Sequence, residues 1–170
     1  MEVITLNKDN LDYWRKKATK NVIALGFFDG VHRGHCEVIA TALQIAKDKK
    51  CALSVMSFFP HPKTVISNGK KRFDYIMPVS EKAKVLQKLG VDRFYVVEFD
   101  KAFASMSPKS YVSKYILDFY TIHAVAGYDF TYGYRGKGNI NRLRYDANNL
   151  IEVTKVDKVE HQGRKISSTW

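Results

Sequence analysis

The feature that most constrains the fold is an alternation of short apolar runs with longer segments of helical periodicity. The apolar runs are short and nearly continuous, as in buried strands, and they occupy residues 21–27, 51–58, 93–99 and 122–127, with two later runs at 150–156 and 165–168. Apolar residues recur at helical spacing in residues 35–47, 78–89 and 107–120. This alternation predicts an α/β domain with a mainly parallel sheet flanked by helices.

Proline, glycine and serine mark the boundaries between these segments. Ser107 followed by Pro108 is typical of a helix start, because the hydroxyl caps backbone N–H groups and proline suits the first helical position. Gly90 is typical of a helix end. Pro60 and Pro62 interrupt regular structure, so we expect a loop from there to residue 77.

Length and composition fit a single globular domain. The chain has 170 residues, of which 45% are apolar and 26% charged, a balance that excludes a disordered chain. No apolar run approaches the roughly 18–20 residues that span a bilayer, and the first residues lack the apolar core of a secretory signal. Two cysteines, Cys36 and Cys51, are too few for a disulfide scaffold and are expected to be small buried residues. We therefore expect a cytoplasmic protein with no membrane partner.

The net charge is the unusual number in the composition. Lys and Arg total 28 against 17 Asp and Glu, which gives +11 at pH 7. Such a charge favours anionic partners, although a surface of solvated lysines would give the same figure. Four basic residues follow the strand at 122–127 closely and could contact phosphates or form a solvated face: Arg135, Lys137, Arg142 and Arg144.

The segment that follows the first predicted strand has the composition of a phosphate-binding turn. Gly26 and Gly30 allow close backbone approach, and His32 and His35 flank the start of the next helix. Free N–H groups at a helix start favour an anion, and imidazoles can donate to phosphate oxygens. A glycine turn with incidental histidines is the alternative. A zinc site with Cys36 is a weaker one, because no four-ligand set is evident.

This segment, GFFDGVHRGH, resembles the signature of the HxGH nucleotidyltransferases in the form used by bacterial FAD synthetases. Further motifs of that family are matched in the same order, by residues 57–62 (SFFPHP), 89–92 (LGVD), 106–112 (MSPKSYV), 127–133 (GYDFTYG) and 166–169 (ISST). The resemblance implies a Rossmann-like nucleotidyltransferase fold. It also implies an enzyme that transfers AMP from ATP to FMN, giving FAD and pyrophosphate.

The resemblance also implies roles for particular residues. His32 and His35 would be catalytic. ATP would be bound by Gly26, Phe27, Phe28, Asp29, His32, His35, Gly127, Asp129, Ser167, Ser168 and Thr169. The flavin would lie against Phe58, Pro60, His61, Pro62, Tyr128 and Phe130. Mg²⁺ would accompany ATP with no metal site of the protein's own, and no nucleic acid is expected as a partner.

Two departures from the family pattern and two alternatives complete the predictions. Nothing in the sequence corresponds to the riboflavin kinase domain of bifunctional members, and the arginine of the last motif would fall beyond Trp170. We therefore expect one FMN adenylyltransferase domain over residues 1–170, truncated at its C-terminal end. The alternatives are another HxGH adenylyl- or cytidylyltransferase, and a flavin- or nucleotide-binding regulator without turnover.

Overall fold

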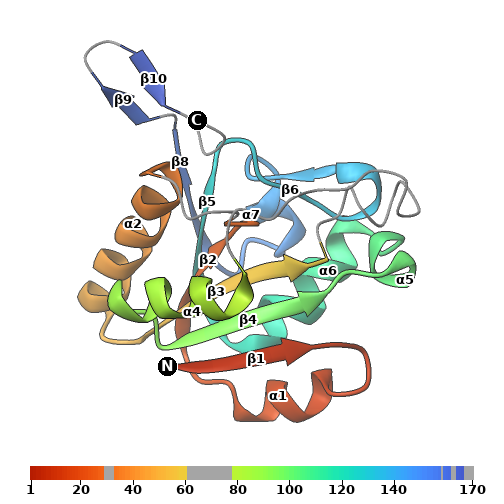
Figure 1. The fold of residues 1–170 in the computed structure, drawn as a ribbon. Helices are drawn as coiled ribbons and strands as arrows, with labels where there is room; N and C mark the ends of the chain where they lie inside the picture. The colour runs from red at the N-terminus through yellow and green to blue at the C-terminus, as the bar shows by residue number, and fades with distance from the viewer. Residues whose placement is uncertain (29–32, 61–77, 158, 162–163, 167–170) are drawn as a thin grey trace.

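A six-stranded sheet forms the centre of the molecule, and all of its strands are parallel (Figure 1). The computed structural model describes residues 1–28, 33–60, 78–157, 159–161 and 164–166. The strands lie in the order β1 (Glu2–Leu6), β4 (Arg93–Glu98), β3 (Ala52–Phe59), β2 (Asn21–Leu25), β5 (Thr121–Gly127) and β8 (Glu152–Val156). The predicted α/β fold with a parallel sheet is confirmed.

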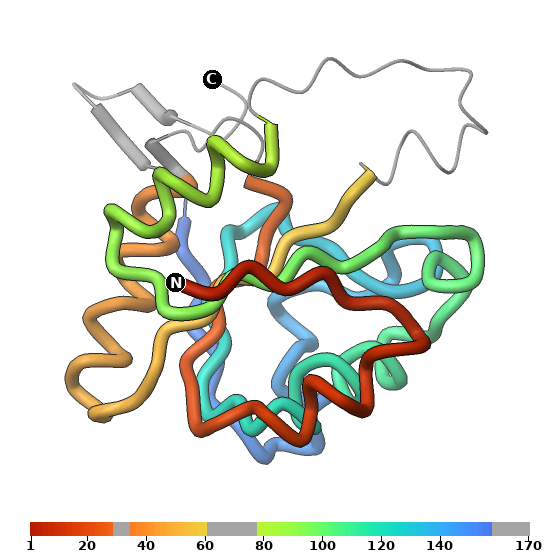
Figure 2. The backbone as a smooth tube through the Cα atoms, turned by 60° about the horizontal axis from the view of Figure 1, so that its bottom comes forward, coloured from red at the N-terminus to blue at the C-terminus, as the bar shows by residue number. Residues whose placement is uncertain are grey.

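Helices cover both faces of the sheet. Figure 2 shows α2 (Arg33–Lys49) and α4 (Val79–Lys88) on one side, with α1 (Leu11–Lys17) and α6 (Pro108–Tyr115) on the other. The described residues also form the shorter helical turns α5 (Lys101–Ala104), η1 (Leu117–Phe119), η2 (Tyr134–Gly136) and α7 (Leu143–Asp146). Within the described part of the chain, two antiparallel pairs lie outside the main sheet, β6 (Thr131–Tyr132) with β7 (Gly138–Asn139), and β9 (Val159–His161) with β10 (Arg164–Ile166).

The two faces of the sheet carry different side chains, because successive strand residues point to opposite sides. The side against α2 and α4, here the aliphatic face, is built mainly from Val22, Ala24, Leu53, Val55, Val96 and Val125. The core layer between the opposite side of the sheet and α1, α6 and η1, here the aromatic face, includes Phe58, Tyr95, Tyr111, Tyr115, Phe119, Phe130 and Tyr132. The hydrophobic core therefore consists of two separate layers, one on each face.

Several local predictions are confirmed, with a physical cause for each. The Ser107 hydroxyl accepts from the Ser110 N–H at 3.1 Å and caps α6, with Pro108 at the first helical position. Gly90 follows α4 with a φ of +94°, which glycine adopts without strain. The Asp92 carboxylate then accepts from the Leu53 N–H at 2.9 Å, so it fastens this turn to β3.

Other local predictions need correction. The helix predicted to reach residue 120 ends at Tyr115, after which the 3₁₀ turn η1 leads to Tyr120, whose φ is +60°. The late strand predicted at 165–168 is confirmed by β10 as far as Ile166, in a hairpin outside the main sheet, while residues 167–168 lie outside the described residues. Cys36 and Cys51 are half-buried rather than buried. The loop predicted to reach residue 77 falls mostly on residues 61–77, outside the described residues.

Candidate functional site

Those predicted site residues that the structure describes lie at the carboxyl ends of β2, β3 and β5, which are neighbours in the sheet (Figure 1). Leu25 of β2 is in register with Met56 of β3 and with Ala126 of β5. The chain builds β3 and β4 on one side of β2, and β5 and β8 on the other. The order of strands thus reverses between β2 and β5, where open parallel sheets bind their ligands.

The structure describes only some of the predicted site residues. It brings together Gly26, Phe27, Phe28 and His35 with Phe58 and Pro60, and with residues 127–130. The others lie outside the described residues, and their roles stay predictions: Asp29, His32, His61, Pro62, Ser167, Ser168 and Thr169.

Two successive phenylalanines diverge where the chain leaves β2. The Phe27 ring lies 5.5 Å from the Phe58 ring and 5.9 Å from the Phe130 ring, on the aromatic face. The Phe28 ring is only 1% exposed and packs in the aliphatic face. Phe28 reaches this position with a φ of +54°, which is uncommon for a residue other than glycine. Gly26 makes room, since a Cβ there would lie 3.0 Å from the Phe28 ring.

His35 lies in the first turn of α2, directly against Phe28. Their ring centroids are 5.2 Å apart in an edge-to-face arrangement at 74°, and the imidazole is half-buried. The first N–H groups of an α-helix have no partner within the helix and attract anions. An imidazole braced at this position can donate to a phosphate oxygen that is held by the same helix end.

The backbone carbonyl of Phe27 accepts two hydrogen bonds from side chains. The Ser57 hydroxyl donates to it at 2.7 Å and the Lys82 ammonium at 3.1 Å. The sequence reasoning did not single out Lys82, although a signal was present. Lys82 lies three residues after Val79 and four before Leu86, so it occupies the apolar register of α4. It is 5% exposed, and this burial of a charged side chain marks it as unusual.

The aromatic residues predicted to contact flavin differ in exposure. Phe58 and Phe130 are 7% and 4% exposed and stack on each other at 6.3 Å. Their rings are enclosed by the aromatic face. Tyr128 and Pro60 are half-buried, and Phe59, whose neighbour Phe58 points inward, is the more exposed ring of that pair at 46%. Phe59 was missed because its motif did not indicate which of its rings faces outward.

The segment after β5 is fixed by its own hydrogen bonds. The Tyr128 N–H donates to the Val156 carbonyl at 2.9 Å, and the Phe130 N–H donates to the Gly127 carbonyl at 3.2 Å. Asp129 is exposed and its carboxylate folds back over Gly127, where a Cβ would lie 3.3 Å from its oxygen. The edge of the sheet therefore presents a carboxylate next to the turn after β2.

A buried carboxylate holds the remainder of this segment against the aromatic face. Asp146 is 1% exposed, accepts from the Tyr132 hydroxyl at 2.7 Å, and receives two bonds from Arg142 at 3.0 and 2.9 Å. Burial raises the pKa of Tyr132, as does the adjacent Asp146 carboxylate. Of the four basic residues considered for phosphate contact, Arg142 is engaged by Asp146, whereas Arg135 and Lys137 lie over the Tyr134 ring.

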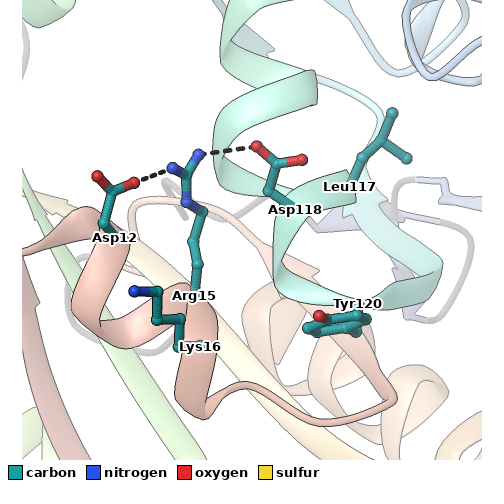
Figure 3. Close-up of a pocket in the computed structure, with 6 residues that line it drawn as sticks. All are labelled: Asp12, Arg15, Lys16, Leu117, Asp118 and Tyr120. Atoms are coloured by element: carbon teal, nitrogen blue, oxygen red, sulfur yellow. Dashed lines mark hydrogen bonds and ion pairs between the residues drawn. The ribbon is translucent and has the colours of Figure 1, made fainter.

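A surface cavity of about 350 Å³ lies at the other end of the sheet (Figure 3). Its walls come from α1 and η1, the segments that lead into the amino ends of β2 and β5. Inside it, the Arg15 guanidinium pairs with both Asp12 and Asp118. Charges of both signs line this cavity, and its Arg15 is already paired with two carboxylates, which does not favour an anionic nucleotide, so we do not assign the cavity to the predicted site.

Two further properties concern the described part of the chain only. Within it, no three side chains of His, Cys, Asp or Glu come together as a metal ion would require. None of its helices has the length and apolar character needed to cross a membrane.

The fold agrees with that of known protein structures. A solved structure described as pantothenate synthetase from Thermus thermophilus matches 99% of the chain and 66% of its own with a TM-score of 0.64, at 18% identity. A structure described as a macrolide-efflux protein from Streptococcus pneumoniae has a TM-score of 0.82 at 28% identity, over 99% and 63% of the two chains. The chain therefore shares its fold with the structure described as pantothenate synthetase.

Sequence comparisons identify the protein family. The model of the FAD synthetase family matches residues 14–170, and the chain belongs to this family. The bifunctional riboflavin kinase/FMN adenylyltransferase of Bacillus subtilis is 44% identical, over 92% of this chain and 49% of that protein. The FAD synthetase of Listeria monocytogenes is 32% identical, over 91% and 63%. The chain thus spans about half the length of the bifunctional relatives that it matches.

Proposed function

We propose that this chain, as a single domain, catalyses the transfer of AMP from ATP to FMN. A phosphate oxygen of FMN attacks the α-phosphorus of ATP, the bond from that phosphorus to the bridging oxygen breaks, and pyrophosphate leaves with the electron pair. FMN carries its own ionised nucleophile, so the protein contributes positioning and charge stabilisation rather than a covalent intermediate. The observation that carries the proposal is the position of His35. It lies in the first turn of α2, packs edge to face on Phe28, and stands where the order of strands reverses.

The chain's own residues suit this role. The start of α2 and the His35 imidazole would receive the ATP phosphates and stabilise the charge that develops on the leaving pyrophosphate. We further propose that His32 acts beside His35, and that Ser167, Ser168 and Thr169 add hydroxyl donors. Flavin would lie along the rim after β3 and β5, where Pro60 and Tyr128 are partly exposed.

Magnesium fits this site as a companion of ATP. The described residues offer no three-ligand group, whereas the Asp129 carboxylate is exposed beside Gly127. One carboxylate together with substrate phosphates is an ordinary way to hold Mg²⁺. Bound in this way, the ion would neutralise phosphate charge. A cytoplasmic location and small-molecule partners, ATP and FMN, complete the proposal.

The test is the conversion of FMN into FAD by the purified chain with ATP and Mg²⁺, followed by chromatography and pyrophosphate release. We expect His35→Ala to lower turnover at least about tenfold, because one well-aimed donor is worth about 10²–10³ in kcat. His123→Gln serves as the control, since His123 lies near the amino end of β5 and away from the site. His32→Ala should resemble His35→Ala.

Three outcomes would contradict the proposal. Undiminished turnover in His35→Ala would mean that AMP transfer does not take place at this edge of the sheet. AMP transfer to another phosphate-bearing acceptor, such as phosphopantetheine or nicotinamide mononucleotide, without transfer to FMN would indicate a different nucleotidyltransferase. Binding of ATP and FMN without release of pyrophosphate would indicate a regulator.

A further inference from the structure

Lys82 is a buried lysine at the edge of the sheet that carries the candidate site. Its side chain extends from α4 and is 5% exposed. Burying an ammonium group is costly unless hydrogen bonds replace its hydration. Its Nζ donates to the Phe27 carbonyl at 3.1 Å, and Phe27 lies in the turn that leads towards α2. A leucine or methionine would fill the same apolar register of α4 at lower cost, which indicates that a donor is needed here.

The same carbonyl accepts a second hydrogen bond from another element. The Ser57 hydroxyl of β3 donates to the Phe27 oxygen at 2.7 Å. A carbonyl oxygen has two lone pairs, and here each meets a side-chain donor from a different element. The peptide group that joins Phe27 to Phe28 is thereby fixed relative to both β3 and α4.

The orientation of this peptide determines where Phe28 goes. Phe28 has a φ of +54°, a strained conformation for a residue that has a side chain. In that conformation its ring enters the aliphatic face and meets His35 edge to face at 5.2 Å. Release of the Phe27 carbonyl would let the peptide rotate, and the support for His35 would be lost with it.

We propose that Lys82 is a positioning residue for AMP transfer, which acts with Ser57 through the Phe27 carbonyl to hold Phe28 against His35. The proposal rests on the proposed function, because His35 is the group through which Lys82 would act. Lys82 is not a catalytic residue in this scheme. Its effect should therefore appear in turnover and in ATP binding, while the affinity for FMN stays nearly constant.

The experiment compares Lys82→Met, Ser57→Ala and the double variant with the wild-type chain. Lys84→Met is the matched control, because Lys84 lies on the same helix and is exposed. We expect Lys82→Met to lower kcat at least about tenfold, since small misplacements of catalytic groups can cost about 10². The KM for FMN should change by less than about twofold, and the melting temperature should not fall, because methionine suits a buried position. Lys84→Met should match the wild type.

The double variant tests whether both donors act through one carbonyl. Independent effects on kcat multiply, whereas residues that serve the same group give a combined loss smaller than the product. We expect the smaller loss of kcat from Ser57→Ala to be largely absorbed in the Lys82→Met background. Ser57→Ala is also a mild change, so it keeps the proposal testable should Lys82→Met fold poorly.

Failure of this inference can be distinguished from failure of the proposed function. If the wild type makes no FAD, the proposed function is wrong, and ATP-dependent thermal stabilisation then tests Lys82 alone, with a loss expected in Lys82→Met. If the wild type makes FAD and Lys82→Met keeps its kcat, the inference is wrong. It is also wrong if Lys82→Met only lowers the melting temperature while activity per folded molecule is unchanged, because that result defines a purely structural role.

Discussion

The aliphatic and aromatic faces of the sheet are assembled in different ways. On the aliphatic face, α2 directly connects the neighbouring strands β2 and β3, and α4 directly precedes β4. On the aromatic face, α1 lies between β1 and β2 in the chain, and α6 with η1 lies between β4 and β5, and neither pair of strands is adjacent in the sheet. The aliphatic face is therefore a product of local sequence, whereas the aromatic face depends on contacts between distant segments.

The candidate site lies where these two layers meet. Phe27 belongs to the aromatic face and Phe28 to the aliphatic face, although they are adjacent in the chain. A change in the packing of either face can thus reach the turn that carries the proposed nucleotide site. Both faces therefore support the same candidate site.

The largest expected effect is on stability and concerns Phe58. Its ring lies within 6.4 Å of five other rings at the centre of the aromatic face, from Phe27, Phe99, Phe103, Tyr111 and Phe130. We expect Phe58→Ala to lower the free energy of unfolding by about 3–5 kcal/mol, measured by urea denaturation. On the aliphatic face, Leu86→Ala should cost less, about 2–3 kcal/mol. An equal or larger cost for Leu86→Ala would mean that the aromatic face does not contribute more than the aliphatic face to the free energy of unfolding.

Phe58→Leu serves as the companion variant, because it keeps an apolar side chain of similar size. Its cost should stay below about 1.5 kcal/mol. A rise in the KM for FMN at this small cost in stability would support the predicted contact between Phe58 and flavin. An unchanged KM would leave Phe58 with a packing role only.

The contrast between the faces also explains what the sequence could predict of the fold. The segments that became β2, α2, β3, α4, β4 and β5 have clear periodicity, and the parallel α/β architecture follows from their alternation. The strand β1 and helix α1 were not predicted. β1 alternates exposed and buried residues over only five positions, and α1 has a single fully buried residue, Leu11. Their stability comes from distant partners, which local pattern does not reveal.

The sequence predicts the location of the candidate site, but only some of the residues that form it. Gly26 and His35 were identified from sequence, and the structure places them together at the expected edge of the sheet. Lys82 was missed because its role depends on the path of the backbone carbonyl of Phe27, a property of tertiary structure. Similarly, sequence could not show that Phe58 faces inward while Phe59 faces outward.

Gly133 and Gly90, one on each face, are expected to differ in how much an alanine at that position lowers stability. Gly133 has a φ of +79° with an extended ψ, and a Cβ there would lie 2.8 Å from the backbone of Pro108 at the start of α6. Gly90 also has a positive φ, but its Cβ would meet only the methyl groups of Leu43, at 3.4 Å. Strain at such positions costs about 1–3 kcal/mol. We expect Gly133→Ala to cost about 3 kcal/mol, because it adds a backbone clash, and Gly90→Ala about 1 kcal/mol.

Urea denaturation of the two alanine variants measures this difference. The Tyr134 N–H next to Gly133 donates to the Met106 carbonyl at 2.8 Å, so displacement at Gly133 would also disturb the start of α6. A larger cost for Gly90→Ala would contradict the view that the aromatic face depends more on close contacts between distant segments.

The smallest expected effect is a dependence of stability on pH, and it arises at the amino end of the sheet beside α2. His123 in β5 is 7% exposed, and its Nε2 lies 2.7 Å from the Thr154 hydroxyl. Its Nδ1 is 3.4 Å from the Glu152 carboxylate, which also pairs with Lys49 at the end of α2. Burial lowers the pKa of His123, and nearby Lys49 lowers it further, whereas Glu152 acts in the opposite direction.

The sign of the effect follows from this lowered pKa. Below the ordinary value of about 6.5, the unfolded chain binds a proton on His123 more readily than the folded chain does. The free energy of unfolding should therefore fall as pH decreases through about 6.5 and level off below the folded pKa. His123→Gln removes this titration, so subtraction of its pH profile from that of the wild type between about pH 7.5 and 5.5 isolates His123 from the other histidines. The prediction is wrong if the wild type instead gains stability relative to His123→Gln on acidification. That result would mean that attraction to Glu152 affects the pKa of His123 more than burial does.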